Sequence, residues 1–251
     1  MRATPSDHRS AAAIATAAGE LLMELRSNLE NLSVHPRLRR DEGDRRSHDF
    51  IVDALAREHP DDAVLSEEGA DDLARLDAER VWIVDPLDGT REFGEPGRTD
   101  WAVHVALVID GHVEAAAVAL PALHATLTAD PPPPPVPAHE GPPRLVVSRS
   151  RPPTVAAALA YHLDGEMLAL GSAGAKAMAV VLGFADVYAH SGGQYEWDSA
   201  APVGVAAAAG LHVSRLDGTA LEYNRPDPWL PDLLICRPEL VEPILAVTAG
   251  F

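Results

Sequence analysis

A short apolar run that ends in two carboxylates is the feature of this sequence that most constrains its fold and its chemistry. Residues 81–84 are apolar and rich in valine and isoleucine, and they lead directly into Asp85-Pro86-Leu87-Asp88-Gly89-Thr90. Such a run predicts a buried strand that enters a turn. Two carboxylates at the end of a strand suit a hard divalent cation, while a glycine followed by a hydroxyl at a helix start suits phosphate oxygens.

Two other segments of the chain offer further carboxylates. Glu67 and Glu68 follow the apolar residues 63–65, and Asp198 stands at the head of an alanine-rich segment that we expect to be helical. Because no histidine or cysteine lies among these acids, they favour magnesium or manganese over zinc. Each segment alone is weak evidence for a metal site. Asp-Gly after a strand, for example, is most often an ordinary turn. Their combination predicts a metal site.

Together the three segments resemble the motifs of the magnesium-dependent, lithium-sensitive phosphomonoesterase family that includes inositol monophosphatase and the adenosine bisphosphate phosphatases. The resemblance covers roughly residues 40–205. Ser66-Glu67-Glu68-Gly69 and Arg91-Glu92-Phe93 look most like the bacterial branch that hydrolyses 3′-phosphoadenosine 5′-phosphate. The resemblance implies an α/β fold, an αβαβα sandwich with the metals between its two halves, and a homodimer.

The resemblance also implies roles for individual residues. The implied metal ligands are four carboxylates and one backbone carbonyl, those of Glu67, Asp85, Asp88, Asp198 and Leu87. Thr90 matches the family's threonine, which together with an acid polarises the attacking water, and that acid falls at Asp44. The family's usual lysine and threonine-aspartate signature is replaced here by residues 37–42. Asp41 and Asp49 therefore stay open as alternatives to Asp44.

Hydrolysis of a phosphomonoester requires a nucleophile at neutral pH and neutralisation of the substrate's charge. We expect two or three Mg²⁺ ions, of which one lowers the pKa of its bound water and another stabilises the leaving alkoxide. The N–H groups of Gly89 and Thr90 would hold phosphate oxygens, and no covalent phosphoenzyme is expected. The haloacid dehalogenase superfamily is disfavoured, because one residue separates its two aspartates, whereas two residues separate Asp85 from Asp88. An EF-hand is excluded because its alternating ligands are missing.

Several residues in the second half of the chain are candidates for substrate contact. Lys176, the single lysine among 20 basic residues, follows a glycine-serine turn that contains Ser172. The adenosine bisphosphate phosphatases carry a similar element at their nucleotide pocket, although a plain turn with a solvated lysine is the alternative. Ser148 and Arg149 are candidates for the second phosphate, or else belong to a surface loop. Glu196 is a candidate for a sugar hydroxyl, or else an ordinary acid in the first turn of a helix.

Charge and cysteine content limit the partners and the compartment. A formal net charge of −18 makes nucleic-acid polymers poor partners, whereas a small phosphorylated substrate can bind where metals and arginines reverse the local sign. Cys236 is the single cysteine, which excludes a disulfide within the chain and a cysteine-rich zinc site and favours the cytoplasm. No apolar stretch reaches membrane-spanning length, so we expect no membrane partner.

A proline-rich linker, residues 130–143, divides the chain into two predicted halves, residues 1–129 with the metal motifs and 144–251 with the substrate pocket. In the first half, Asp110-Gly111 predicts a hairpin of antiparallel strands. In the second half, strands alternate with helices, which favours parallel pairing. The predicted strands there are 144–148, 167–171, 184–190 and 211–215, and the predicted helices are 153–162, 174–183 and 198–209.

These observations predict a magnesium-dependent phosphomonoesterase of sulfur assimilation that removes the 3′-phosphate of adenosine 3′,5′-bisphosphate, or of its 5′-phosphosulfate analogue. Inositol monophosphatase or fructose bisphosphatase activity is the alternative within the class, since the metal motif is shared. A non-catalytic metal- or nucleotide-binding protein is the alternative from another class. The presence of Thr90 and a full set of acids argues against it.

Overall fold

Two five-stranded sheets form the frame of the molecule. The computed structural model describes residues 2–137 and 140–249; residues 138 and 139, within the predicted linker 130–143, lie outside the described part. The strands are β1 (Ala63–Ser66), β2 (Arg80–Asp88), β3 (Ala102–Ile109), β4 (His112–Leu120), β5 (Ala125–Thr128), β6 (Arg144–Ser148), β7 (Glu166–Leu170), β8 (Val187–Tyr195), β9 (His212–Ser214) and β10 (Trp229–Cys236).

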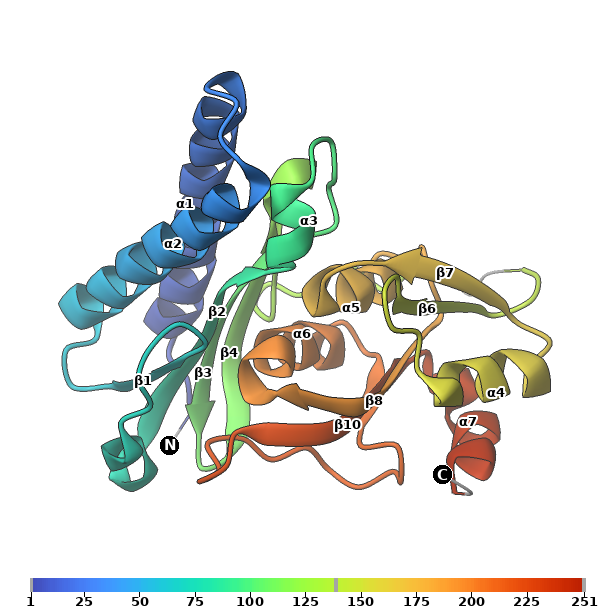
Figure 1. Ribbon diagram of the computed structural model, residues 1–251. Helices are drawn as coiled ribbons and strands as arrows, with labels where there is room; N and C mark the ends of the chain where they lie inside the picture. Colours follow the sequence, from blue (N-terminus) through green and yellow to red (C-terminus); the bar gives the residue numbers. More distant parts are fainter. Residues whose placement is uncertain (1, 138–139, 250–251) are drawn as a thin grey trace.

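Helices cover both sheets and fill the space between them. The α-helices are α1 (Pro5–Asn31), α2 (Pro36–Glu58), α3 (Thr90–Gly94), α4 (Thr154–His162), α5 (Ala173–Val181), α6 (Glu196–Ala208) and α7 (Val241–Thr248). Short 3₁₀ helices are η1 (Leu73–Asp77), η2 (Pro121–Leu123) and η3 (Pro238–Leu240). The layers run from α1 and α2 through the first sheet, α5 and α6, and the second sheet to α4 and α7 (Figure 1). The predicted αβαβα sandwich is confirmed.

The first sheet has the order β1-β2-β3-β4-β5 and is antiparallel except for the parallel pair β1–β2. The predicted hairpin forms between β3 and β4. Asp110 and Gly111 have φ angles of 51° and 77°, as a two-residue turn with two positive φ values requires. Antiparallel pairing in this half was therefore readable from the sequence.

Strand β2 has no solvent-facing side, which explains why its sequence is continuously apolar rather than alternating. Trp82 and Val84 point toward α1 and α2, while Val81 and Ile83 point toward α5 and α6. A third apolar cluster lies between the second sheet and the outer helices α4 and α7. The end of β2 consequently projects its acids into the interior of the sandwich.

The second sheet has the order β7-β6-β8-β10-β9. Strands β7, β6 and β8 are parallel, as predicted, but β8, β10 and β9 are antiparallel. The prediction of parallel pairing throughout this half was wrong, because the alternation of predicted strands and helices did not include β10. That strand contains Pro231, beside a register shift between Leu230 and Asp232, and a proline that cannot donate to the ladder weakens the signature of a strand.

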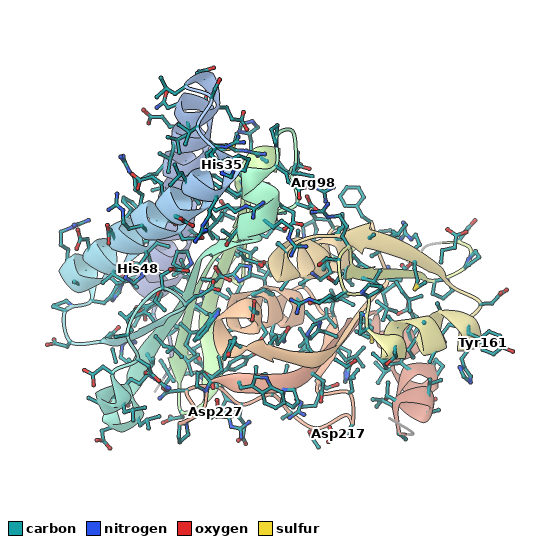
Figure 2. All side chains as sticks on the ribbon, viewed as in Figure 1. His35, His48, Arg98, Tyr161, Asp217 and Asp227 are labelled. Carbon is teal, nitrogen blue, oxygen red and sulfur yellow. The ribbon has the colours of Figure 1, made fainter. Side chains whose placement is uncertain are left out.

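Helix α2 is longer than its apolar spacing suggests. The spacing is visible only around residues 50–55, yet the helix begins at Pro36, where the Nδ1 of His35 accepts a hydrogen bond from the N–H of Arg37 at 3.2 Å. His48 lies farther along α2 (Figure 2). Its Nδ1 is 2.9 Å from the hydroxyl oxygen of Ser66, at the end of β1. Helix α2 therefore lies beside the strand end that carries the paired glutamates. Among the described residues, no helix combines the length and apolarity needed to cross a membrane.

Candidate metal centre and substrate cleft

The carboxylates of Asp85 and Asp88 reach the same side of the first sheet because β2 contains a bulge. Residues three apart on a regular strand face opposite sides. Here Asp85 pairs with His104 and Asp88 with Ala102, so β2 has one more residue than β3 across this interval. The N–H of Leu87 donates to Oδ1 of Asp85 at 3.0 Å and stabilises the turn.

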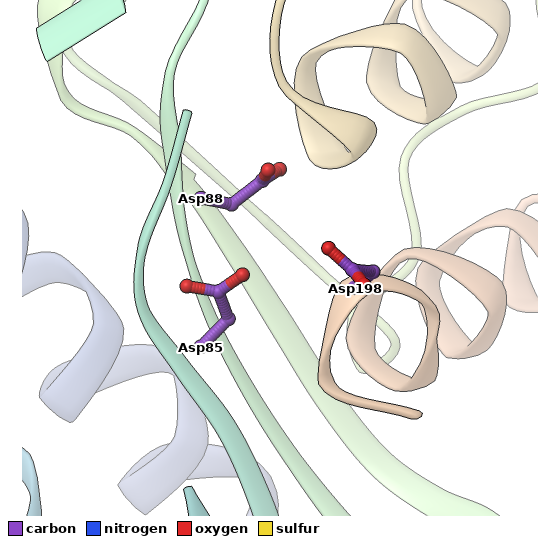
Figure 3. Close-up of side chains that lie close together, drawn as sticks. All are labelled: Asp85, Asp88 and Asp198. Atoms are coloured by element: carbon purple, nitrogen blue, oxygen red, sulfur yellow. The ribbon is translucent and has the colours of Figure 1, made fainter. Parts of the chain in front are cut away.

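Asp198 approaches these two acids from the second half of the chain. It lies in the first turn of α6, where its Oδ2 accepts the N–H of Tyr195 at 2.7 Å. One ligand oxygen from each of Asp85, Asp88 and Asp198 lies within 4.8 Å of the others. The three side chains point toward a common space between strand and helix (Figure 3). Acids that are far apart in the sequence therefore converge, as the resemblance requires.

Glu67 joins this cluster from the end of β1. Its N–H donates to the carbonyl of Val84 at 3.3 Å, which extends the β1–β2 pairing by one residue. Its carboxyl group shares a hydrogen bond with Asp85. Desolvation in the cleft and the charges of Asp198 and Asp88 raise the pKa of Glu67 to about 7, although its side chain remains solvent-accessible.

The other acids of the cluster are also shifted. Burial and the charges of Glu67 and Asp88 raise the pKa of Asp85 well above its usual value. Burial and the charge of Asp88 raise the pKa of Asp198 to about 6. Carboxylates held this close repel one another unless a cation lies between them. Four oxygen-bearing side chains without nitrogen or sulfur fit a hard divalent ion such as Mg²⁺.

Thr90 connects the cluster to α2. Its Oγ1 is 3.1 Å from Oδ1 of Asp44 and 3.1 Å from the carbonyl of Leu87. Burial and the charge of Glu68 raise the pKa of Asp44 to about 7. The competing acids Asp41 and Asp49 are exposed on the same helix. Of the three, Asp44 is the acid that the structure brings to Thr90.

One buried residue of this site, His104 on β3, was not predicted from the sequence. Its Nε2 is 3.2 Å from Oδ2 of Asp88, and its Nδ1–H donates to the carbonyl of Trp197 at 3.0 Å. Burial opposes ionisation of Asp88, but the charge of His104 and backbone N–H donors at the start of α5 hold the pKa of Asp88 at about 2. A histidine within the apolar run 102–109 is the one signal that could have indicated it.

Lys176 is buried rather than solvated. Its Nζ donates to the carbonyls of Gly171 and Ser172, and the negative charges of Asp88 and Asp198 act on it. The Ser172 hydroxyl accepts the N–H of Ala175 at 2.8 Å and begins helix α5. Lys176 and Ser172 both line a cleft of about 480 Å³ that also contains Gly89, Asp88 and Asp198.

Two predicted substrate contacts lie elsewhere. Arg149 forms ion pairs with Glu92 at 2.7 Å and Glu95 at 3.0 Å, and it is absent from the described lining of the cleft, whereas Ser148 belongs to it. Glu196 is buried, and its two carboxylate oxygens accept the backbone N–H groups of residues 224 and 225. The structure does not bring these two side chains to the cleft: Glu92 on α3 and Glu95, directly after it, hold Arg149, and Glu196 fixes a loop.

A sequence model of the inositol monophosphatase family matches residues 6–130 and 144–246. This chain belongs to the inositol monophosphatase family. The family match omits residues 131–143, which include the proline run and most of the predicted linker.

Among the curated proteins, several bacterial nucleotide phosphatases are similar in sequence to this family member. The 3′-phosphoadenosine 5′-phosphate phosphatase of Mycobacterium leprae is 51% identical over 257 residues, which cover 96% of this chain and 93% of the relative. The protein of the same name from Mycobacterium tuberculosis is 52% identical, over 91% of this chain and 87% of the relative. The 3′(2′),5′-bisphosphate nucleotidase CysQ of Escherichia coli is 31% identical, over 73% and 79%.

Solved structures of the family share the layered fold. CysQ from Bacteroides thetaiotaomicron, described as a bacterial member of the inositol monophosphatase family, superimposes with a TM-score of 0.77 at 27% identity, covering 92% of this chain and 97% of that one. Inositol monophosphatase II from Staphylococcus aureus has a TM-score of 0.80 at 21% identity, covering 96% and 92%. At 21% identity, the similarity to the Staphylococcus aureus protein shows the fold alone.

Proposed function

We propose that this phosphatase hydrolyses the 3′-phosphate of adenosine 3′,5′-bisphosphate, or of its 5′-phosphosulfate analogue, to release inorganic phosphate. The observation that carries the proposal is the convergence of Asp85, Asp88 and Asp198, with their oxygens within 4.8 Å, beside the Thr90–Asp44 pair. The choice of substrate rests on the mycobacterial relatives, whose names specify this nucleotide and which are about half identical along nearly the whole chain.

The acids of the cluster, together with the carbonyl of Leu87, are the proposed ligands of two or three Mg²⁺ ions. Their oxygen donors and their mutual repulsion both suit such ions, which when bound supply an activated water and neutralise the leaving group's charge. Asp44 and Thr90 orient the attacking water, with the carboxylate of Asp44 as the proton acceptor. No residue of the chain forms a covalent phosphoenzyme in this scheme.

The remaining cleft residues hold the substrate in our proposal. The N–H groups of Gly89 and Thr90 donate to the transferred phosphate. Lys176 and Ser172, at the start of α5 beside Gly89, limit the space available to the nucleoside and contribute positive charge and a hydroxyl. The volume of the cleft, about 480 Å³, lies in the range of small-molecule sites.

A substrate panel with and without Mg²⁺ tests the proposal. Phosphate release should be fastest from adenosine 3′,5′-bisphosphate, compared with inositol 1-phosphate and fructose 1,6-bisphosphate, and should require the metal. Asp88→Asn should nearly abolish turnover. Faster release from the inositol or fructose ester would replace the proposed substrate, and the absence of release from any of them with Mg²⁺ present would favour a non-catalytic binding protein.

Three further proposals rest on the resemblance and the composition. Lithium should inhibit at low concentration by competing for a magnesium position. The protein should be a homodimer, which sedimentation velocity measures directly. A single cysteine fits a cytoplasmic location, and fractionation of the cells that make the protein checks it.

A further inference from the structure

The proposed substrate carries two phosphates, but the acidic cluster accounts for only one of them. The second phosphate is an anion that must lie elsewhere in a chain with a formal net charge of −18. The basic side chains that line the cleft are those of Arg91, Arg151, Lys176 and His190. Among the described residues, these are the basic side chains available to a second phosphate.

The ammonium of Lys176 is already hydrogen-bonded, and Arg91 belongs to helix α3, whereas Arg151 follows β6. The ammonium of Lys176 already donates to two backbone carbonyls and lies 5.3 Å from the centre of the Tyr188 ring. Arg91 lies in the first turn of α3, directly after Thr90, and in the proposed scheme we assign it to the phosphate that is hydrolysed. Arg151 is then the cleft-lining arginine that remains for the second phosphate.

Arg149 and Arg151 follow the same strand, β6, but have different surroundings. The guanidinium of Arg149 is held by Glu92 and Glu95. In the part of the chain that the structure describes, Arg151 has no carboxylate partner, and it lines the cleft. Its backbone N–H donates to the hydroxyl of Ser148 at 3.3 Å, which fixes the loop at its base.

Alternate residues of β8, the strand that pairs with β6, also line the cleft. Tyr188 and His190 are two apart on this strand, so both side chains face the cleft. Desolvation lowers the pKa of half-buried His190, and the positive charges of Lys176 and Arg151 add to that shift. Arg151, which follows β6, and His190 on the neighbouring strand β8 therefore line the same cleft.

We propose that Arg151 binds the second phosphate and so makes the cleft prefer a bisphosphorylated nucleoside over a monophosphorylated one. This inference rests on the proposed function, because it assigns the other phosphate of the same substrate. A guanidinium suits the task, since its planar array of donors can bind two phosphate oxygens at once. Glu92 and Glu95 hold Arg149 in a structural role, which leaves Arg151 for binding.

The test compares two substrates, adenosine 3′,5′-bisphosphate and adenosine 3′-monophosphate, in the wild type and four variants. Arg151→Ala should lower kcat/KM for the bisphosphate about 10–100-fold, mainly through KM, because a charged hydrogen bond is lost. The same variant should leave kcat/KM for the monophosphate within about twofold. Arg57→Ala, which removes an exposed arginine from α2, should leave the ratio of the two kcat/KM values unchanged.

Two results would overturn the inference. Arg151→Ala could affect both substrates equally, or Arg149→Ala could lower the ratio in its place. Arg151→Lys separates charge from geometry and should recover part of the lost preference. A wild-type protein that releases phosphate from neither nucleotide would instead refute the proposed function, so the two failures are distinguishable.

Discussion

Nε2 of His104 lies 3.2 Å from Oδ2 of Asp88, and both side chains are buried. The other nitrogen of the ring donates to the carbonyl of Trp197, the residue before Asp198. One imidazole thus connects the strand end that carries Asp88 with the helix start that carries Asp198. Gly174 makes room for it, since a Cβ there would lie 2.1 Å from Nε2.

His104→Ala should weaken metal binding without removing a ligand. Loss of a buried partner that orients a ligating carboxylate typically costs about 10–100-fold in metal affinity or activity. We therefore expect the Mg²⁺ concentration for half-maximal activity to rise by that factor. His104→Asn should recover part of the loss, whereas His112→Ala, on the exposed end of the neighbouring strand, should have no effect. An unchanged Mg²⁺ dependence in a folded His104→Ala variant would contradict this role.

The metal motif was predictable because its chemistry is local. Asp85, Asp88 and Thr90 lie within six residues, and a strand followed by a turn determines their surroundings. Their convergence with Asp198 followed from the resemblance to the family rather than from any periodicity. The contact between His104 and Asp88 was not predictable, because a lone histidine in an apolar strand gives no indication of its partner.

The two arginines after β6 illustrate a second limit. Arg149 and Arg151 are equivalent in the sequence, and both follow a predicted strand. Which one faces the cleft depends on Glu92 and Glu95, which lie on another element and are brought beside Arg149 only by the fold. Which side chains of distant elements form ion pairs depends on how those elements pack, and a local sequence pattern does not predict that packing.

Asp198→Asn should stabilise the metal-free protein while abolishing activity. The folded-state pKa of Asp198 is raised to about 6, so its ionised form is disfavoured on folding at neutral pH. A neutral amide removes that cost, which is about 3 kcal/mol, and can still accept the N–H of Tyr195. In EDTA at pH 7.5 the variant should melt several degrees higher than the wild type.

The same experiment includes its own check on metal binding. Adding Mg²⁺ should raise the melting temperature of the wild type, because a ligand that binds the folded state stabilises it. The increase should be much smaller for Asp198→Asn, while Asp61→Asn, an exposed acid, should behave as wild type. A lower melting temperature for Asp198→Asn in EDTA would show that repulsion is not the dominant effect at this position.

Asp7 should contribute stability that depends on pH. Its buried carboxylate pairs with Arg80 at 2.7 Å and caps α1 through the N–H of Thr4, and these contacts outweigh burial and lower its pKa to about 2. Because the folded-state pKa is depressed, the stabilisation is complete above the ordinary value of 3.8 and is lost as the pH falls toward 2.

Urea unfolding of Asp7→Asn measures this contribution. The variant should be less stable than the wild type by about 2 kcal/mol at pH 7, and the difference should shrink below pH 4. Asp53→Asn, which changes an exposed acid on α2, serves as the control and should cost little at either pH. A difference that stays constant from pH 7 to pH 3 would assign the effect to packing rather than to the ion pair.

Asp44→Asn should separate water activation from metal binding. Asp44 is 3.1 Å from the hydroxyl of Thr90, and we place its carboxylate at the attacking water rather than among the ligands. Loss of a positioned general base lowers kcat by about 10²–10⁴-fold, while the Mg²⁺ dependence should change little. Thr90→Ala should lower kcat in the same way, and Asp41→Asn and Asp49→Asn, which alter exposed acids of the same helix, should not. If Asp41→Asn or Asp49→Asn caused the loss in kcat while Asp44→Asn did not, the water-activating role would pass to that residue and Thr90 would need another partner.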